Sequence, residues 1–191
     1  MKKALVIIVS ILITSFNGDN NITIDKKEAL KAFDLLNNIR VNPKEYENIF
    51  PFLKDAKVQK TKLVWNDTLA LVAEKKAFDM ADRNFYAHVD PSGYGINHYI
   101  NKSGYKLNAD WLEDKKANYF ESIAVDTPDG YSAISIFIND HGVPSLGHRT
   151  HLLGLDEWNA SLKDIGIGFV RREIGSDHKI YVCLIIAKHE W

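Results

Sequence analysis

Two apolar segments near the end of the chain constrain its fold more than any other feature. In DIGIGFVRR, the apolar residues Ile165, Ile167 and Phe169 alternate with other residues, which is the period of a β-strand. The segment KIYVCLIIA is a β-rich apolar run, and Gly175, Ser176 and Asp177 lie between the two. Small and polar residues between two such runs are typical of a hairpin loop. The pattern therefore predicts two adjacent antiparallel strands.

The first long segment before this hairpin has the spacing of a helix. DKKEALKAFDLLNNIR opens with Asp25, and Glu28 stands three positions later, as in a capping box. Apolar side chains then recur every three residues, at Leu30, Phe33, Leu36 and Ile39. This repeat predicts an amphipathic helix with one buried face.

A second helix is predicted from residue 66 or 67 onward, with Asn66 or Asp67 as its N-cap. Its buried face contains small residues, which indicates close packing against a neighbouring element. That face comprises Leu69, Ala73, Ala77 and Ala81, and its apolar coverage is widened by Leu71, Phe78 and Met80.

A third helix is predicted in YSAISIFINDH, where Ile134, Phe137 and Ile138 follow helical spacing. Helices thus come first along the chain and adjacent antiparallel strands come last. This order is typical of an α+β domain in which helices pack on an antiparallel sheet.

The start of the chain differs from the rest. Lys2 and Lys3 precede an uninterrupted apolar run at residues 4–16, and a polar stretch follows. This is the pattern of a secretory signal peptide, and the run is short for a membrane span. We therefore expect a signal peptide over residues 1–19 and a single domain over residues 20–191. The mature protein would then be secreted or periplasmic, without a stable membrane span; an uncleaved anchor is the alternative.

Charge and cysteine content exclude some classes of protein. The formal net charge of the 191 residues is -1 and basic residues are scattered, so nothing indicates a nucleic-acid partner. The chain has one cysteine, so it forms no internal disulfide. Because Cys183 lies in an apolar run, we expect a buried, unreactive side chain.

Three histidines stand within eleven positions in HGVPSLGHRTHLLG, at residues 141, 148 and 151. This stretch, together with LVWNDTLALVAEKKAFDMADRNFYAHVDPSG, FESIA and the C-terminal hairpin, resembles the CAP superfamily of cysteine-rich secretory proteins, antigen 5 and pathogenesis-related proteins. The missing disulfides and the GHR…LL form resemble its bacterial branch, whose domain is also called SCP. The resemblance covers roughly residues 29–187. It implies a three-layer α-β-α sandwich with a central, mainly antiparallel sheet.

The same resemblance implies a cleft that contains two histidines and two acids. The residues that match are His88 after the long helix, Glu121 in FESIA, Asp140 three positions after Phe137, and His148 in GHR. Two departures from the family pattern occur. Phe120 and Ser122 replace the usual glycine and asparagine around Glu121, and residue 140 is aspartate where glutamate is usual. His151 is expected to cap or pack, and His141 to end a helix.

The chemistry of these residues is compatible with a metal site. Imidazole nitrogens bind divalent metals such as zinc, and carboxylates complete or orient such sites. His88 and His148 are therefore the candidate metal ligands, with zinc as the possible cofactor. In the absence of a metal, each histidine would pair with a carboxylate.

The function indicated by this resemblance is extracytoplasmic binding of a small ligand, a lipid or a metal ion through the cleft. The possible partners are a small molecule, a lipid or a cell-surface component. One alternative is a metal-dependent hydrolase that uses the same residues. Another is a surface-interaction protein with a vestigial cleft. Whether the protein is an enzyme stays open, because the chain contains neither a G-x-S-x-G elbow nor an H-E-x-x-H motif.

Overall fold

The computed structural model describes residues 21–188, so the expected signal peptide over residues 1–19 lies outside the described part. Within that part, one sheet has the strand order β1-β4-β5-β3, and β2 runs beside β4. All pairings are antiparallel except the short parallel pairing of β2 with β4. The strands are β1 (Ile22–Ile24), β2 (Val64–Trp65), β3 (Glu121–Val125), β4 (Asp164–Arg172) and β5 (Ile180–Ala187).

The predicted hairpin is confirmed as β4 and β5, which pair antiparallel along their length, with Gly168 opposite Cys183. The alternating residues of β4, Ile165, Ile167 and Phe169, are all fully buried. Cys183 is also fully buried, as expected for an apolar strand residue, and it is a free thiol. The two strands therefore form the centre of the core.

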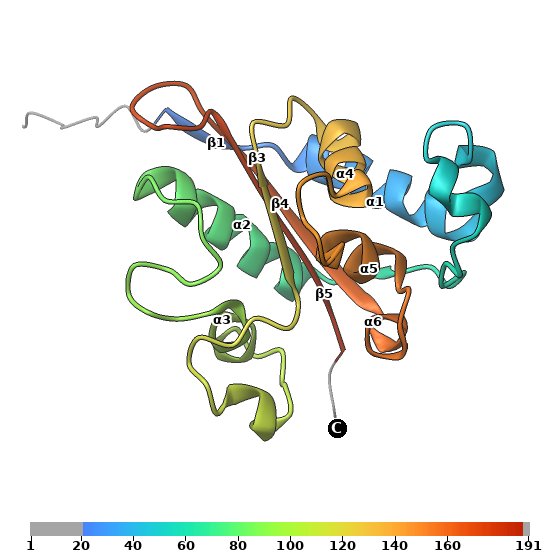
Figure 1. Ribbon diagram of the computed structural model, residues 1–191. Helices are drawn as coiled ribbons and strands as arrows, with labels where there is room; N and C mark the ends of the chain where they lie inside the picture. The colour runs from blue at the N-terminus through green and yellow to red at the C-terminus, as the bar shows by residue number, and fades with distance from the viewer. Residues whose placement is uncertain (1–20, 189–191) are drawn as a thin grey trace, which may run out of the picture.

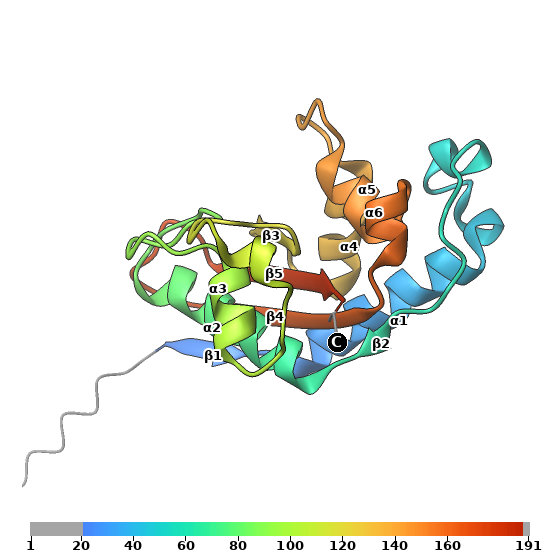
Figure 2. The same cartoon turned by 90° about the horizontal axis from the view of Figure 1, so that it is seen from below.

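Helices cover both faces of this sheet, which confirms the α+β sandwich (Figure 1). α2 packs on β4 and β5, whereas α1 packs on β4 and on α4. Figure 2 shows α2 and α3 on one side of the sheet and α4, α5 and α6 on the other. The helices are α1 (Lys26–Val41), α2 (Asp67–Asp82), α3 (Ile96–Lys102), α4 (Gly130–Asn139), α5 (Gly147–Leu153) and α6 (Glu157–Ser161), with short 3-10 helices at Pro43–Tyr46, Pro51–Lys54 and Ala109–Leu112.

The start of α1 departs from the expected capping box. Asp25 is the N-cap, and its carboxylate accepts a hydrogen bond from the backbone N–H of Glu28 at 3.2 Å. Glu28 does not return the bond. Its carboxylate accepts instead from the backbone N–H of Gly130 at 3.0 Å, at the first residue of α4. Glu28 thus connects α1 to α4 and does not complete a capping box.

The small residues of α2 allow it to lie directly on β4. Asn66 is its N-cap, and Leu69, Ala73, Ala77 and Ala81 are fully buried. Two strand glycines, Gly166 and Gly168, complete this contact, because a Cβ at Gly168 would lie 2.3 Å from the carbonyl oxygen of Ala73. The close packing predicted from the alanines is therefore present. Leu71 differs from expectation, since it is 47% exposed.

Among the helices of residues 21–188, none has both the length and the apolar character needed to cross a membrane.

Candidate functional site

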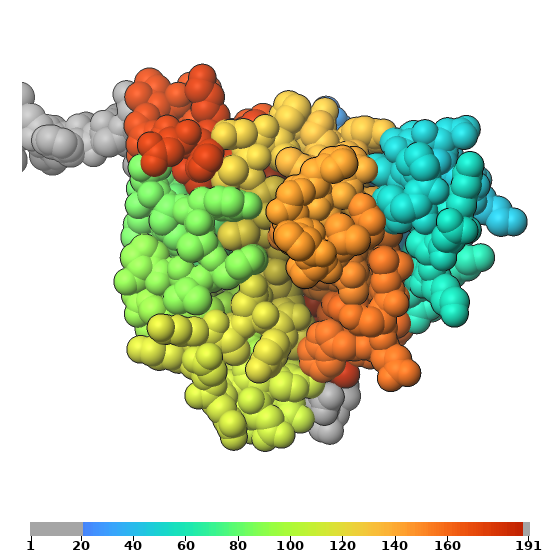
Figure 3. Space-filling view, in the orientation of Figure 1, coloured from blue at the N-terminus to red at the C-terminus, as the bar shows by residue number. Residues whose placement is uncertain are grey.

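A cavity of about 420 Å³ lies where the segment leading into β3 meets α5 and α6. Figure 3 shows these two regions side by side on one face, in yellow and orange. Three of the four residues predicted for the cleft line this cavity: His88, Glu121 and His148. The fourth, Asp140, is buried and is bonded to His148. The structure thus brings together residues from four separate parts of the sequence.

His88 is paired with Glu121 across the cavity wall. Nδ1 of the imidazole and Oε2 of the carboxylate are 2.7 Å apart. The Glu121 side chain is fully buried, whereas the His88 side chain is 43% exposed. Glu121 begins β3, and its backbone N–H donates to Oδ1 of Asn118 at 3.1 Å. A strand therefore fixes the acid, and the acid fixes the histidine.

The turn that carries His88 is held by a buried lysine. Lys76 lies on α2 and is only 6% exposed, and its ammonium group donates to two carbonyl oxygens, those of Ala87 at 2.8 Å and His88 at 2.9 Å. Sequence reasoning missed this contact, because a single lysine on a helix is usually solvated. The only indication of this contact in the sequence was the position of Lys76 next to the alanine face of α2.

His148 is paired with Asp140 in a second, separate arrangement. Nδ1 of His148 and Oδ1 of Asp140 are 2.7 Å apart, and Oδ2 accepts from the backbone N–H of Arg149 at 3.2 Å. Asp140 ends α4 in the left-handed conformation, with φ at 50°. The ring of Phe137, one turn earlier, lies against the imidazole, with centroids 5.4 Å apart. The Phe137-x-x-Asp140 motif thus provides two contacts to one histidine.

The two pairs leave the same imidazole atom available. Because Nδ1 of His88 and of His148 donates to a carboxylate, the neutral ring keeps its lone pair on Nε2. The structure gives no hydrogen bond to Nε2 of either ring within residues 21–188. A carboxylate bonded to one nitrogen is the usual outer partner of a histidine that binds metal through the other.

The number of possible metal ligands is small. Within residues 21–188, no group of three or more His, Cys, Asp and Glu side chains is placed to hold a metal ion together. Both carboxylates are already engaged by imidazole, so the available donors are the two Nε2 atoms. Two protein donors are fewer than the closed four-ligand arrangement of structural zinc sites requires.

A third histidine pair was not predicted. Oγ of Ser122 and Nδ1 of His151 are 2.8 Å apart, and both residues line the cavity although little of either is exposed. Burial lowers the pKa of His151 to about 4, so the ring is neutral at physiological pH. We expected His151 to cap or pack, and its burial agrees with packing. The one signal for the pair in the sequence was Ser122, which departs from the family pattern.

His141 follows the end of α4, is exposed, and is not among the residues that line the cavity. Arg149 also has a structural role, because its guanidinium donates to the carbonyl oxygens of Ile138 at 2.7 Å and Asn139 at 2.8 Å. It therefore closes the end of the helix on which Asp140 lies.

Comparisons with known proteins point in one direction. A family model described as the cysteine-rich secretory protein family, CAP, matches residues 33–185. A 1.5 Å crystal structure of an extracellular protein containing an SCP domain, from Bacillus anthracis, superimposes with a TM-score of 0.53 at 24% identity. That match covers 86% of this chain and 41% of the Bacillus chain, so this chain spans less than half of that protein.

A second similar structure is an outer surface protein from Borrelia burgdorferi. It superimposes with a TM-score of 0.53 at 20% identity, and the match covers 86% of this chain and 96% of the Borrelia chain. At these identities, both likenesses show a shared fold. No curated protein matched the sequence.

Proposed function

The chain belongs to the cysteine-rich secretory protein family, and from this premise we propose that it is an extracytoplasmic binding protein whose His/acid cavity takes a divalent metal ion. The ion would be held by Nε2 of His88 and Nε2 of His148. One observation carries the proposal: two histidines that line one cavity are each hydrogen-bonded at Nδ1 to a buried carboxylate.

The arrangement supports metal binding for electrostatic and entropic reasons. A carboxylate on Nδ1 makes Nε2 a better donor and holds the ring in one orientation, so less freedom is lost on binding. Zinc accepts imidazole nitrogen readily, and water or ligand atoms would fill its remaining positions. When bound, such an ion supplies a Lewis acid at the cavity wall.

An extracytoplasmic location is supported by two independent features. The first residues have the pattern of a secretory signal, with Lys2 and Lys3 before an apolar run. The two similar structures are described as an extracellular protein and as an outer surface protein. N-terminal sequencing of the native protein tests this part: a mature chain that begins after about Ser15 is expected, and one that still begins at Met1 would contradict it.

Calorimetric titration of the purified protein with zinc chloride tests the metal proposal. We expect binding of one ion, and His88→Ala or His148→Ala should each abolish it, because each removes half of the protein donors. His141→Ala is the matched control, since this exposed histidine lies outside the cavity. Zinc affinity that is the same in both cavity variants and in the wild type would overturn the proposal.

A further inference from the structure

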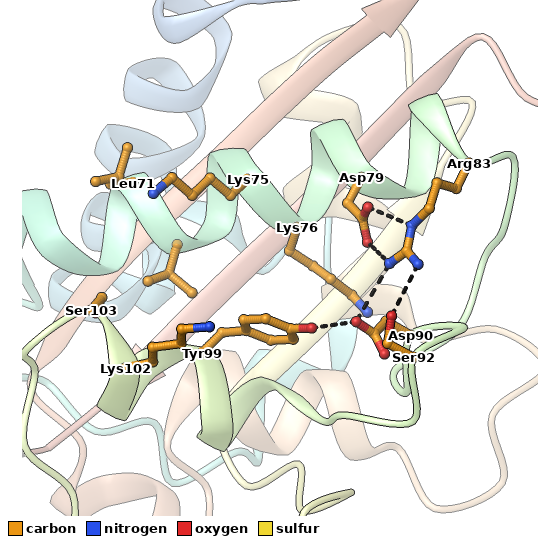
Figure 4. Close-up of a pocket in the computed structure, with 11 residues that line it drawn as sticks. Leu71, Lys75, Lys76, Asp79, Arg83, Asp90, Ser92, Tyr99, Lys102 and Ser103 are labelled. Carbon is orange, nitrogen blue, oxygen red and sulfur yellow. Dashed lines mark hydrogen bonds and ion pairs between the residues drawn. The ribbon is translucent and has the colours of Figure 1, made fainter.

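A second cavity, of about 490 Å³, lies between α2 and α3, outside the His/acid cavity (Figure 4). Six of the eleven residues that line it are charged. Four of them are cations, Lys75, Lys76, Arg83 and Lys102, and two are carboxylates, Asp79 and Asp90. Four positive minus two negative charges leave an excess of two positive charges around the cavity.

The two carboxylates are neutralised at one end of this pocket. Nε of Arg83 donates to Oδ1 of Asp79 at 2.6 Å, and the same guanidinium lies 3.4 Å from Asp90. Asp90 also accepts bonds from the Tyr99 hydroxyl and from the backbone N–H of Tyr94, the latter at 2.9 Å. Burial opposes ionisation of Asp90, but these bonds outweigh it and lower its pKa, so the carboxylate stays charged.

Lys76 lies at the same end of the pocket as Asp79, Asp90 and Arg83. Its ammonium group is buried and already donates to the carbonyl oxygens of Ala87 and His88. Arg83 and Lys76 therefore match the charges of Asp79 and Asp90. The excess positive charge of the pocket resides on the two remaining lysines.

Lys75 and Lys102 lie at the opposite end, near Leu71 and Ser103 (Figure 4). One lysine comes from α2 and the other from the last turn of α3. Within residues 21–188, neither forms an ion pair or a hydrogen bond through its ammonium group. Both unpaired ammonium groups line the same cavity, so an anion placed between them would be attracted to both.

The wall at this end is apolar. Leu71 is 47% exposed although it lies on a helix whose other large aliphatic residues are buried, and Val72 is buried beside it. An anion bound here could therefore carry a small apolar substituent. Two uncompensated charges also match a phosphate monoester, which carries a charge close to −2 near neutral pH, better than they match a single carboxylate.

We propose that the pocket between α2 and α3 binds the phosphate group of an organic phosphate, held by the ammonium groups of Lys75 and Lys102. The organic substituent lies against Leu71 and Val72. The phosphate has two possible sources, a free phosphate monoester or the monoester headgroup of phosphatidic acid, and both present a charge close to −2 to the lysines.

The test uses calorimetric titration of the purified protein with glycerol 3-phosphate, and sedimentation with vesicles of phosphatidylcholine with or without phosphatidic acid. We expect saturable binding to the soluble probe, or to the vesicles that contain phosphatidic acid. Binding to the soluble probe assigns a free phosphate monoester, and binding to those vesicles alone assigns a lipid headgroup.

The variant Lys75→Met/Lys102→Met should weaken this binding at least about tenfold, because it removes both charged donors. Both lysines are exposed, so the urea denaturation midpoint should stay unchanged and rule out misfolding. Lys27→Met is the control, since Lys27 is an exposed lysine of α1 outside the pocket. Equal affinity in the double variant, or no saturable binding to either probe, would overturn the proposal.

Discussion

Nδ1 of His88 lies 2.7 Å from Oε2 of Glu121, whose side chain is fully buried at the start of β3. The pair joins a loop residue to a strand residue 33 positions away, and its geometry leaves Nε2 of the histidine free for a ligand. The position of Glu121 is fixed by the strand on which it lies. The histidine is half exposed, so its orientation depends on that one hydrogen bond.

Glu121→Gln should therefore lower zinc affinity about 10- to 100-fold while both histidines stay in place. The amide keeps the size of the side chain but removes the charge that makes the imidazole a better donor. Calorimetric zinc titration measures the effect, and Glu113→Gln, at an exposed position, serves as the control. Unchanged affinity in Glu121→Gln would show that the buried acid does not orient a metal ligand.

Asp140 has two roles: its carboxylate orients His148, and its backbone adopts the left-handed conformation that ends α4. Two substitutions separate these roles. Asn tolerates the left-handed conformation found at residue 140, so Asp140→Asn should lower zinc affinity about tenfold with little change in stability. Asp140→Ala should also destabilise the protein, by about 1 kcal/mol, because alanine avoids that conformation. Urea denaturation and zinc titration of the two variants test this, and equal stability of both would contradict the backbone role.

The fold could be predicted from the sequence because its signals are local. The alternation in β4 and the alanine face of α2 both follow from which residues must be buried, and Gly166 and Gly168 agree with the same packing. The three-layer arrangement came from the family resemblance, since periodicity alone does not say which helix covers which face.

The cavity was less predictable because its contacts join distant positions. No spacing rule indicates that Ser122 bonds to His151, or that Lys76 reaches the carbonyl oxygen of His88. Leu71 was expected to widen a buried face, but α2 rests on the sheet through its alanines, which turns Leu71 toward the second pocket. Such side chains take their roles from the packing of other elements.

Burial of His151 makes stability depend on pH. Its pKa is about 4 in the folded protein, whereas the unfolded value is close to 6.5. Between these values the unfolded chain binds more protons than the folded one, so stability is full above about pH 6.5 and falls as the pH drops toward 4. The loss from this group approaches about 3 kcal/mol.

His151→Asn should remove this part of the pH dependence, because asparagine does not titrate and its amide oxygen can still accept from Ser122. Urea denaturation between pH 4 and 7 measures the free energy of unfolding of both proteins. The carboxylates whose pKa is lowered, such as Asp25 and Asp129, titrate in both, so the difference between the two curves isolates His151. Parallel curves would contradict a buried, neutral His151.

Gly168→Ala tests the contact between α2 and β4. The new Cβ would lie 2.3 Å from the carbonyl oxygen of Ala73 and 2.4 Å from the backbone nitrogen of Glu74, so one element must move away from the other. Overpacking of this kind costs about 1–3 kcal/mol, and a clash with helix backbone, which cannot rotate away as a side chain can, places the expected loss at the upper end. Gly147→Ala is the control, because its Cβ would meet only the Ser145 hydroxyl at 3.5 Å.

Since α2 also carries Lys76, which holds the His88 turn, Gly168→Ala should weaken zinc binding as well as stability. A stability loss with unchanged zinc affinity would mean that the turn is positioned independently of how closely α2 lies on the sheet.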